Sequence, residues 1–354
     1  MIFRQLYDST SSTYTYLLGC EGAREAVVID PVYEQFDRDT ALIRELGLRV
    51  LYVLDTHVHA DHVTAAWRLR KALGADVVLS DRYGAQGVTK GVDHGDRICF
   101  GGCELEVRAT PGHTAGCLTY VTGDHNMAFT GDCLMIRGAG RTDFQGGDVH
   151  TMWHSIREQI FSLPDHCLIY PGHDYAGRTV STVGEERQYN PRIGGEAREE
   201  DFAGFMDNLG LPHPRLLEIA VPANLKSGEP DHPDEPAPQS WAPITISFAG
   251  IPEISPVWVA THHKDVHVLD VRSEAEYCGD LGHIDGAQLI PLSELRDRTD
   301  ELPQDQPIVV ACQSGRRSAM ATNILKAAGF DKVANVTGGM LQWCRLGLPI
   351  SPTG

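Results

Sequence analysis

Short apolar runs bounded by turn residues recur along the first half of the chain. The run at residues 50–54 is β-branched and aromatic, which is typical of a buried strand. Residues 126–129 and 167–170 form further short strands, and residues 103–109 alternate apolar and polar side chains in the manner of a strand. Residues 63–73 have helical spacing. Strands that alternate with helices in this way predict an α/β fold.

The second half of the chain contains three regions of different pattern. Residues 196–221 place apolar side chains at helical spacing, so we expect them to be helical. Residues 225–244 are rich in proline and charge, which is typical of a surface linker. Beyond them, strands such as 307–311 alternate with helical segments, which predicts a parallel α/β domain. A chain of 354 residues is therefore expected to hold two domains, at 1–224 and 245–354.

Composition and charge narrow the classes of partner. The formal net charge of −18 argues against a nucleic-acid partner, which would favour a basic face. No apolar run approaches the roughly 18 residues of a membrane helix, and the first residues lack the apolar core of a signal peptide. The nine cysteines are scattered without a Cys-x-x-Cys pair, as expected of reduced thiols in a cytoplasmic protein. The sequence leaves the oligomeric state open, and a homodimer is one of the states it allows.

The densest group of chemically active side chains follows the strand at residues 50–54. His57 and His59 are two positions apart, so on an extended segment their side chains face the same way. Three later strands each deliver a further histidine or aspartate beside a glycine that permits a tight turn. Histidine and carboxylate groups are ligands for zinc, iron and manganese. The seven candidate residues of this metal site are His57, His59, Asp61, His62, His113, Asp132 and His173.

These residues carry a resemblance to the metallo-β-lactamase superfamily that spans roughly residues 1–220. The resemblance implies an αββα sandwich with the metal site at its edge. The motifs that carry it are Thr56-His57-x-His59-x-Asp61-His62, Pro111-Gly112-His113, Thr130-Gly131-Asp132 and Tyr170-Pro171-Gly172-His173.

A second chemical site is expected in the C-terminal domain. Cys312 lies where the strand at 307–311 stops and a helix starts, and loop N–H groups and the helix dipole favour an anion there. The thiolate is the nucleophilic form of cysteine, so this place suits a reactive thiol. The candidate persulfide or anion loop consists of Gln313, Ser314, Gly315, Arg316 and Arg317.

The loop Cys312-x-x-Gly315-x-Arg317 resembles that of a single-domain rhodanese, over about residues 245–350. The resemblance implies that Cys312 is the catalytic residue and carries sulfane sulfur as a persulfide. It also implies that Asp270 and Arg272 form a structural pair near the loop. The other motifs that carry it are Leu269-Asp270-Val271-Arg272, Gly282-His283-Ile284-x-Gly286-Ala287 and Gly338-Gly339-Met340-x-x-Trp343.

The seven metal-site residues allow two arrangements. With two metals, all seven would be ligands and Asp132 the bridge, an arrangement that suits thioester hydrolysis of the glyoxalase II type. With one metal, His57, His113 and Asp132 form a two-histidine, one-carboxylate triad that suits ferrous iron. The residues that would then orient the ligands and bound water are His59, Asp61, His62 and His173.

Two observations favour one iron. Residues 135–145, just after Asp132, and the run His173-Asp174-Tyr175 resemble the persulfide dioxygenase branch of the superfamily. A rhodanese also handles the sulfane sulfur that a persulfide dioxygenase consumes, whereas a thioesterase has no such need. The whole chain therefore resembles a persulfide dioxygenase–rhodanese fusion.

This resemblance implies a bifunctional enzyme of sulfur metabolism. Cys312 would transfer sulfane sulfur from thiosulfate to glutathione, and a site with one Fe(2+) per chain would oxidise glutathione persulfide with O2 to sulfite and glutathione. Arg141 and Tyr175 are our candidates for holding the glutathione moiety, whose carboxylates call for cationic or hydroxyl partners. Arg137 and Arg178 rank behind them.

Two alternatives belong to other functional classes. One is a binuclear zinc glutathione-thioester hydrolase with a sulfurtransferase tail. The other is a sulfur-carrier or sensor module in which Cys312 stores persulfide for a partner.

Overall fold

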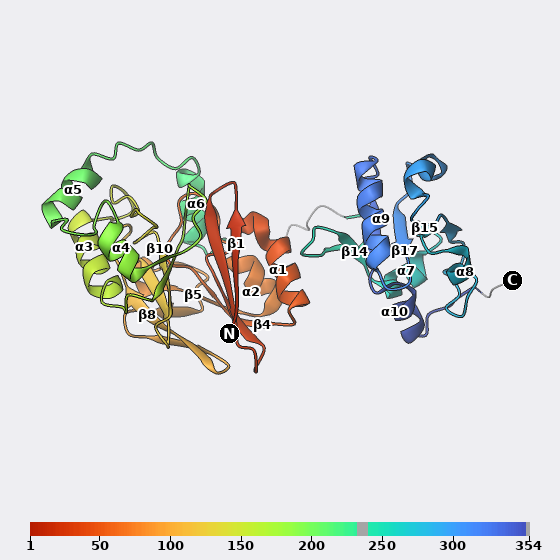
Figure 1. The fold of residues 1–354 in the computed structure, drawn as a ribbon, viewed down its shortest axis with the longest axis horizontal. Coiled ribbons are helices and arrows are strands. Elements are labelled where there is room, and N and C mark those ends of the chain that lie inside the picture. Colours follow the sequence, from red (N-terminus) through yellow and green to blue (C-terminus); the bar gives the residue numbers. More distant parts are fainter. Residues whose placement is uncertain (232–239, 352–354) are drawn as a thin grey trace. The chain divides into compact units, whose positions relative to one another are not determined.

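The computed structural model describes residues 1–231 and 240–351, and the chain divides into two compact units at residues 1–233 and 234–354 (Figure 1). Part of the predicted linker, residues 232–239, lies outside the described residues. Ser227 is buried in the first unit and Ala242 in the core of the second, so packed structure extends into both ends of the segment 225–244. The described residues contain no helix long and apolar enough to cross a membrane.

The first unit is built on two six-stranded sheets. Parallel pairing dominates one half of the first sheet, from β3 to β6, and antiparallel hairpins form most of the second. The first sheet consists of β1 (Ile2–Asp8), β2 (Thr13–Gly19), β3 (Glu25–Ile29), β4 (Arg49–Leu54), β5 (Asp76–Ser80) and β6 (Lys90–Val92). The second consists, in spatial order, of β12 (Ser181–Thr182), β11 (Leu168–Pro171), β10 (Met127–Gly131), β9 (Leu118–Thr122), β8 (Cys103–Ala109) and β7 (Arg97–Phe100).

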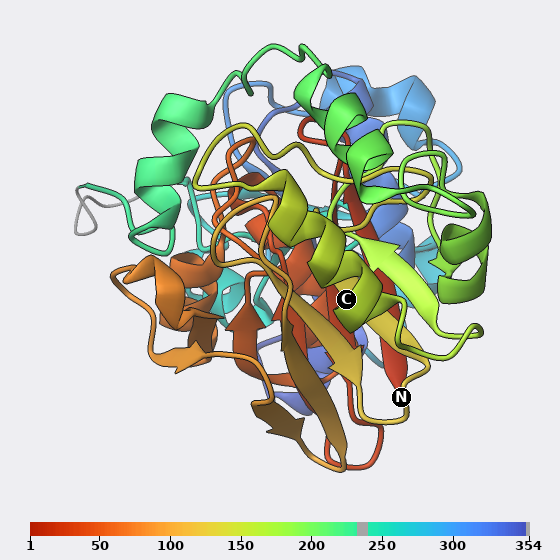
Figure 2. The same cartoon turned by 90° about the vertical axis from the view of Figure 1, so that its left-hand side faces the viewer.

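Three apolar layers show that these sheets form the predicted αββα sandwich. Inward-facing side chains such as Leu54 and Phe129 pack between the two sheets. Leu42 and Leu69 pack helices α1 and α2 against the first sheet, and Phe202 belongs to the layer that packs helices against the second. In Figure 2 the yellow-green helices α3 and η3 lie across the yellow strands of the second sheet. The helices of this unit are η1 (Tyr33–Gln35), α1 (Phe36–Glu45), α2 (Ala66–Leu73), η2 (Asp81–Tyr83), α3 (Val149–His154), η3 (Ser155–Ile160), α4 (Val183–Tyr189), α5 (Glu199–Asp207) and α6 (Leu217–Asn224).

The prediction of helix throughout residues 196–221 is wrong for residues 196–198, which precede α5, and for residues 208–216. The latter segment is an irregular loop between α5 and α6. Gly210, Pro212 and Pro214 account for the break, because proline lacks an amide hydrogen and glycine is costly in a helix. The helix predicted from residue 63 likewise starts only at Ala66.

The second unit contains one six-stranded sheet that is parallel except at its β13 edge. Apolar side chains cover both faces, with Met340 and Trp343 of α10 on one side and Ala321 and Leu325 of α9 on the other. This is the predicted parallel-sheet α/β domain. The strands, in spatial order, are β13 (Thr245–Ile246), β14 (Pro252–Ile254), β18 (Val333–Val336), β17 (Ile308–Ala311), β15 (His267–Asp270) and β16 (Gln288–Leu289). The helices are α7 (Pro256–His262), α8 (Glu274–Tyr277), η4 (Leu295–Glu301), α9 (Arg316–Ala327) and α10 (Gly339–Arg345).

Candidate metal centre and reactive thiol

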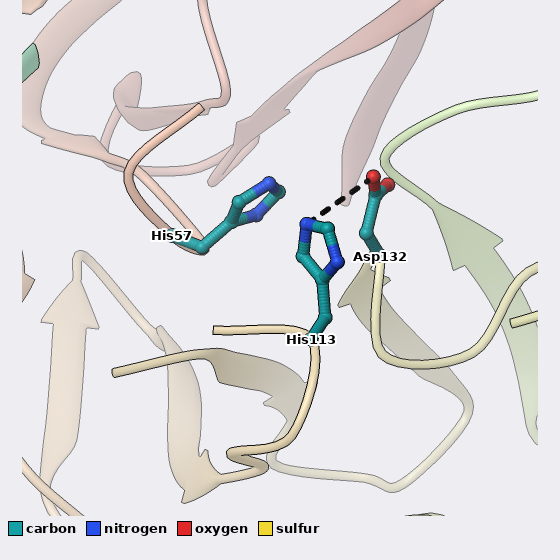
Figure 3. Close-up of side chains that lie close together, drawn as sticks. All are labelled: His57, His113 and Asp132. Atoms are coloured by element: carbon teal, nitrogen blue, oxygen red, sulfur yellow. Dashed lines mark ion pairs between the residues drawn. The ribbon is translucent and has the colours of Figure 1, made fainter. Parts of the chain in front are cut away.

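Three candidate metal ligands converge at the ends of three strands. His57, His113 and Asp132 follow β4, β8 and β10, and one potential ligand atom from each lies within 4.8 Å of the others (Figure 3). Nε2 of His113 is 3.7 Å from Oδ2 of Asp132. All three side chains are buried. Two imidazoles and one carboxylate are a suitable donor set for a divalent metal, so the residues present fit such an ion.

Hydrogen bonds determine which nitrogen of each histidine is available. Nδ1 of His113 donates to the carbonyl oxygen of Arg141 at 2.6 Å. Nδ1 of His57 donates to the Thr56 hydroxyl at 2.9 Å, and this hydroxyl donates in turn to Asp30. Burial, followed by the charges of neighbouring histidines, lowers the pKa of His57 well below its ordinary value, and burial lowers the pKa of His113. Both rings are therefore neutral, with Nε2 able to bind a metal.

His173 holds the third candidate ligand in place. Its Nδ1 donates to Oδ1 of Asp132 at 2.7 Å and its Nε2 to Oδ2 of Asp61 at 2.9 Å. Burial alone would lower the pKa of His173, but the two carboxylates raise it well above its ordinary value. Burial would raise the pKa of Asp132, whereas the charge and hydrogen bond of His173 lower it. Asp132 is thus an oriented, ionised carboxylate.

The remaining residues of the histidine motif form a second group. One potential ligand atom from each of His59, Asp61 and His62 lies within 4.8 Å of the others. Oδ2 of Asp61 is 3.0 Å from Nδ1 of His62, and Nε2 of His59 is 3.2 Å from Oδ1 of Asp30. Nδ1 of His59 and Nε2 of His62 are buried and have no hydrogen-bond partner among the described residues. Such atoms are costly unless an ion or water binds them, so this group is a candidate second metal position.

Asp30 supports the centre and was missed by sequence reasoning. At the end of β3, it accepts hydrogen bonds from the backbone and hydroxyl of Thr56 and from His59. Its φ of 51° is unusual for a residue other than glycine, a kind of strain that concentrates at functional sites. The available signal was a carboxylate at the end of a strand, as for the predicted ligands.

Two glycines of the motifs are required by close approach. Gly131 has a φ of 52°, and a Cβ there would lie 2.6 Å from Oγ1 of Thr56. A Cβ on Gly172 would lie 2.9 Å from Oδ1 of Asp132. The absence of side chains at these positions therefore allows the strand ends to meet.

The metal centre opens into a pocket of about 810 Å³. The loop 208–216 supplies much of one wall, and Arg141 and Tyr175 also line the pocket. The Arg141 guanidinium binds both carboxylate oxygens of Asp143 and the carbonyl oxygens of Leu211 and Pro212. Arg141 thus fastens the wall, with most of its hydrogen-bonding capacity engaged.

The other three candidates for glutathione binding are placed differently from Arg141. Tyr175 is 73% exposed, and its ring is nearly parallel to that of His173. Arg137 pairs with Glu185 and Glu186, and Arg178 donates to the carbonyl oxygen of Ile136. Because the three arginines are engaged in these contacts, Tyr175 is the most accessible of the four candidates for a ligand in this pocket.

In the second unit, Cys312 lies between β17 and α9 and is buried. Its Sγ is 3.2 Å from the backbone nitrogen of Gly315 and 3.2 Å from Oγ of Ser318. Two amides in the first turn of α10, those of Met340 and Leu341, donate to the carbonyl oxygens of Cys312 and Gln313. With these carbonyls bound from outside the loop, the N–H of Gly315 faces the sulfur, where it stabilises an anion.

Two of the arginines near this loop are already paired with carboxylates. Arg317 binds Glu276, and this contact lowers the pKa of Glu276 to about 2. Arg272 is buried against Asp270, with Nη2 to Oδ2 at 2.7 Å, in the structural pair that the sequence predicts. The loop side chains left exposed are Gln313, Ser314 and Arg316.

Comparisons with known proteins agree with this division. The model of the Metallo-beta-lactamase superfamily matches residues 9–173, and the model of the Rhodanese-like domain matches residues 255–346. The mitochondrial persulfide dioxygenase ETHE1 of Homo sapiens is 54% identical over 229 residues, which cover 64% of this chain and 89% of that protein. The chain belongs to the persulfide dioxygenase branch of the metallo-β-lactamase superfamily. Because a rhodanese-like domain follows, it is a persulfide dioxygenase–rhodanese fusion, as its motifs predict.

Solved structures and a further relative place this fusion among its neighbours. The crystal structure of ETHE1 from Myxococcus xanthus is 50% identical, with a TM-score of 0.62, and the match covers 64% of this chain and 100% of that one. The structure of a metallo-beta-lactamase from Staphylococcus aureus is 27% identical with a TM-score of 0.60, and it covers 95% of this chain and 98% of its own. A hydroxyacylglutathione hydrolase from Polaromonas is 33% identical over 242 residues, 63% of this chain and 89% of that protein.

The contacts of His173 predict a large effect on the metal centre. In His173→Ala the carboxylate of Asp132 loses the hydrogen bond that orients it toward the metal, so we expect metal affinity to fall roughly 10- to 100-fold. Metal titration of the stripped protein measures this. His150→Ala is a matched control, because His150 is an exposed histidine that pairs with Glu199. Equal metal affinity in the two variants would contradict the role of His173.

Proposed function

We propose that this chain is a bifunctional enzyme, a persulfide dioxygenase and a thiosulfate sulfurtransferase. The main support for this proposal is that His57, His113 and Asp132 converge in a domain that is 54% identical to persulfide dioxygenases. The same chain holds Cys312 in an anion-binding loop of a rhodanese-like domain. Its substrates would be thiosulfate, glutathione, glutathione persulfide and O2, and its nine free cysteines fit a cytoplasmic location.

Sulfur transfer would take place at Cys312. Its thiolate attacks the outer sulfur of thiosulfate, the S–S bond breaks, and sulfite leaves with the bonding electron pair. Glutathione thiolate then attacks the outer sulfur of the Cys312 persulfide, which gives glutathione persulfide and restores the thiolate. The amide of Gly315 and the hydroxyl of Ser318 would stabilise the charged sulfur, since each lies 3.2 Å from Sγ.

Oxygenation would take place at the centre of the first domain. One Fe(2+) held by His57, His113 and Asp132 would supply the activation of O2, and the overall reaction converts glutathione persulfide, O2 and water to glutathione and sulfite. The chain's own part is to orient these ligands: the Arg141 carbonyl holds His113, Thr56 holds His57, and His173 holds Asp132.

The pocket would accommodate the glutathione moiety. Tyr175 offers an exposed ring and hydroxyl beside His173. Arg141 would contribute a cation to the substrate's carboxylates if it exchanged its carbonyl partners on the 208–216 wall for them. Binding at Arg141 would therefore be coupled to the position of this wall.

A binuclear hydrolase of glutathione thioesters is the second candidate function. The unpartnered nitrogens of His59 and His62 favour it, because a second metal would satisfy them. The 33% identity with a hydroxyacylglutathione hydrolase also supports it. Against it, both ring nitrogens of His173 are already engaged, Nδ1 with Asp132 and Nε2 with Asp61.

Metal content separates the two functions. We expect about one iron per chain in purified protein, since one triad supplies the ligands, and O2 uptake when glutathione persulfide is added. Elemental analysis and an oxygen electrode measure these quantities. About two zinc ions per chain, with hydrolysis of a glutathione thioester and no O2 uptake, would establish the hydrolase instead.

A further inference from the structure

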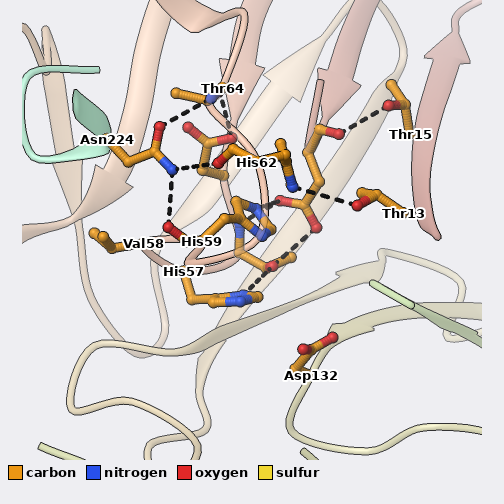
Figure 4. Close-up of polar contacts among 12 residues, drawn as sticks. Thr13, Thr15, His57, Val58, His59, His62, Thr64, Asp132 and Asn224 are labelled. Atoms are coloured by element: carbon orange, nitrogen blue, oxygen red, sulfur yellow. Dashed lines mark hydrogen bonds and ion pairs between the residues drawn. The ribbon is translucent and has the colours of Figure 1, made fainter. Parts of the chain in front are cut away.

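Asn224, the last residue of α6, is buried against the turn that carries the histidine motif (Figure 4). Its Nδ2 donates to the carbonyl oxygen of His59 at 2.9 Å and to that of His62 at 2.8 Å. Its Oδ1 accepts from the backbone N–H of Thr64 at 2.9 Å. The side chain thus makes three hydrogen bonds to one short segment about 160 residues earlier in the chain.

The turn needs this partner because it lacks regular structure. Residues 55–65 form neither helix nor ladder strand, apart from an isolated bridge between Val32 and Thr64. Buried carbonyl and N–H groups in such a turn must be satisfied from elsewhere. A primary amide supplies two donors and an acceptor in one plane. A carboxylate at this place would face two carbonyl oxygens, and an apolar side chain would leave three backbone groups unpaired.

The chain after Asn224 is locked to the same region. The backbone of Ser227 accepts from Trp67, and that of Leu225 accepts from Gln86. Gly228 approaches Thr64 so closely that a Cβ would lie 2.1 Å from its carbonyl oxygen. The end of α6 is therefore held at a fixed distance from the turn.

On the other side, α6 is continuous with the pocket wall. The loop 208–216 runs directly into α6, and Arg141 holds this loop at Leu211 and Pro212. Arg141 also holds His113 through its carbonyl oxygen. One chain segment thus connects the fixed end of the wall to the motif turn.

We propose that Asn224 is a positioning residue for the metal centre. By fixing the main chain at His59 and His62, it holds His57 at the distance from His113 and Asp132 that a shared metal requires. Loss of its amide lets the turn relax and loosens the metal without changing any ligand. The proposal rests on the proposed function only in that the ion bound there is iron.

The test compares Asn224→Ala and Asn224→Asp with wild-type protein as the full iron-loaded chain. We expect iron to transfer to EDTA roughly 10- to 100-fold faster in both variants, as for other groups that orient metal ligands. The kcat of O2 uptake with glutathione persulfide falls by a similar factor. KM stays within about twofold, because the backbone bonds of Leu225 and Ser227 still hold the end of α6 and the pocket wall that runs into it. Sulfur transfer by Cys312 serves as an activity control within the same chain, and thermal unfolding reports the state of the first domain.

Ser227→Ala is the matched control. It removes a hydrogen bond from the same segment to Gln86 without touching the motif turn, so its iron transfer rate should match wild type. Asn224→Ser, which keeps a short polar group, takes the place of any Asn224 variant that fails to fold. The proposal is overturned if folded Asn224 variants release iron within twofold of wild type, or if Ser227→Ala releases it equally fast. If wild-type protein takes up no O2, the proposed function fails, while the iron transfer rates still decide the role of Asn224.

Discussion

Replacing Cys312 with serine is expected to lower sulfur transfer from thiosulfate to glutathione by more than about 1,000-fold, because serine offers no thiolate to carry the persulfide. O2 uptake with supplied glutathione persulfide should stay within about twofold of wild type. This is because the proposed ligands of the iron that activates O2, His57, His113 and Asp132, belong to the other unit. Sulfite release from thiosulfate and oxygen-electrode traces measure the two activities on one preparation.

The exposed Cys278 provides a matched control for this experiment, since Cys278→Ser removes a thiol of the same domain that lies outside the loop. It should preserve both activities. Loss of O2 uptake in a folded Cys312→Ser protein would show that the two sites do not divide the chemistry as proposed. Full retention of transfer would remove Cys312 from the reaction.

Replacing Asp132 with alanine should have the opposite effect to Cys312→Ser: O2 uptake is lost and sulfur transfer is kept. The variant loses the carboxylate of the triad and leaves His173 paired only with Asp61, so metal retention and O2 uptake should fall by more than about 100-fold. Sulfur transfer at Cys312 should stay at the wild-type rate. Elemental analysis of the purified variant and the same two activity assays measure the result.

Asp143→Ala is a suitable comparison for Asp132→Ala, because Asp143 is an exposed carboxylate that pairs with Arg141 and offers no ligand to the triad. It should retain iron. An Asp132→Ala protein that keeps one iron per chain and oxidises glutathione persulfide would refute the triad. Equal loss of sulfur transfer would point to a folding defect of the whole chain.

Much of the fold followed from local patterns in the sequence. Apolar runs such as residues 50–54 are strands because they are short, β-branched and bounded by turn residues. The strands before His57, His113, Asp132 and His173 were all found in this way, since each motif directly follows its strand. The helix prediction for residues 196–221 failed because Gly210, Pro212 and Pro214 interrupt the helical spacing, and the backbone of these residues disfavours a helix.

The residues that support the ligands were harder to find. Asp30 had a weak signal as a carboxylate at a strand end, but its contact with Thr56 depends on the pairing of β3 with β4. Asn224 had no local signal at all. Its position at the end of a helix, far along the chain from His59 and His62, becomes meaningful only after both segments have packed.

The sequence by itself determined the two domains' fold classes, the kinship with persulfide dioxygenases and rhodaneses, and the candidate side chains. These features depend on residue identity and on short spacings along the chain, and both are present in the sequence before the chain folds. Only the tertiary structure decided that His173 pairs with Asp132 and Asp61, and that Arg141 is fastened to the pocket wall. Hydrogen bonds of this kind depend on distances of about 3 Å between segments far apart in sequence, and folding alone sets those distances.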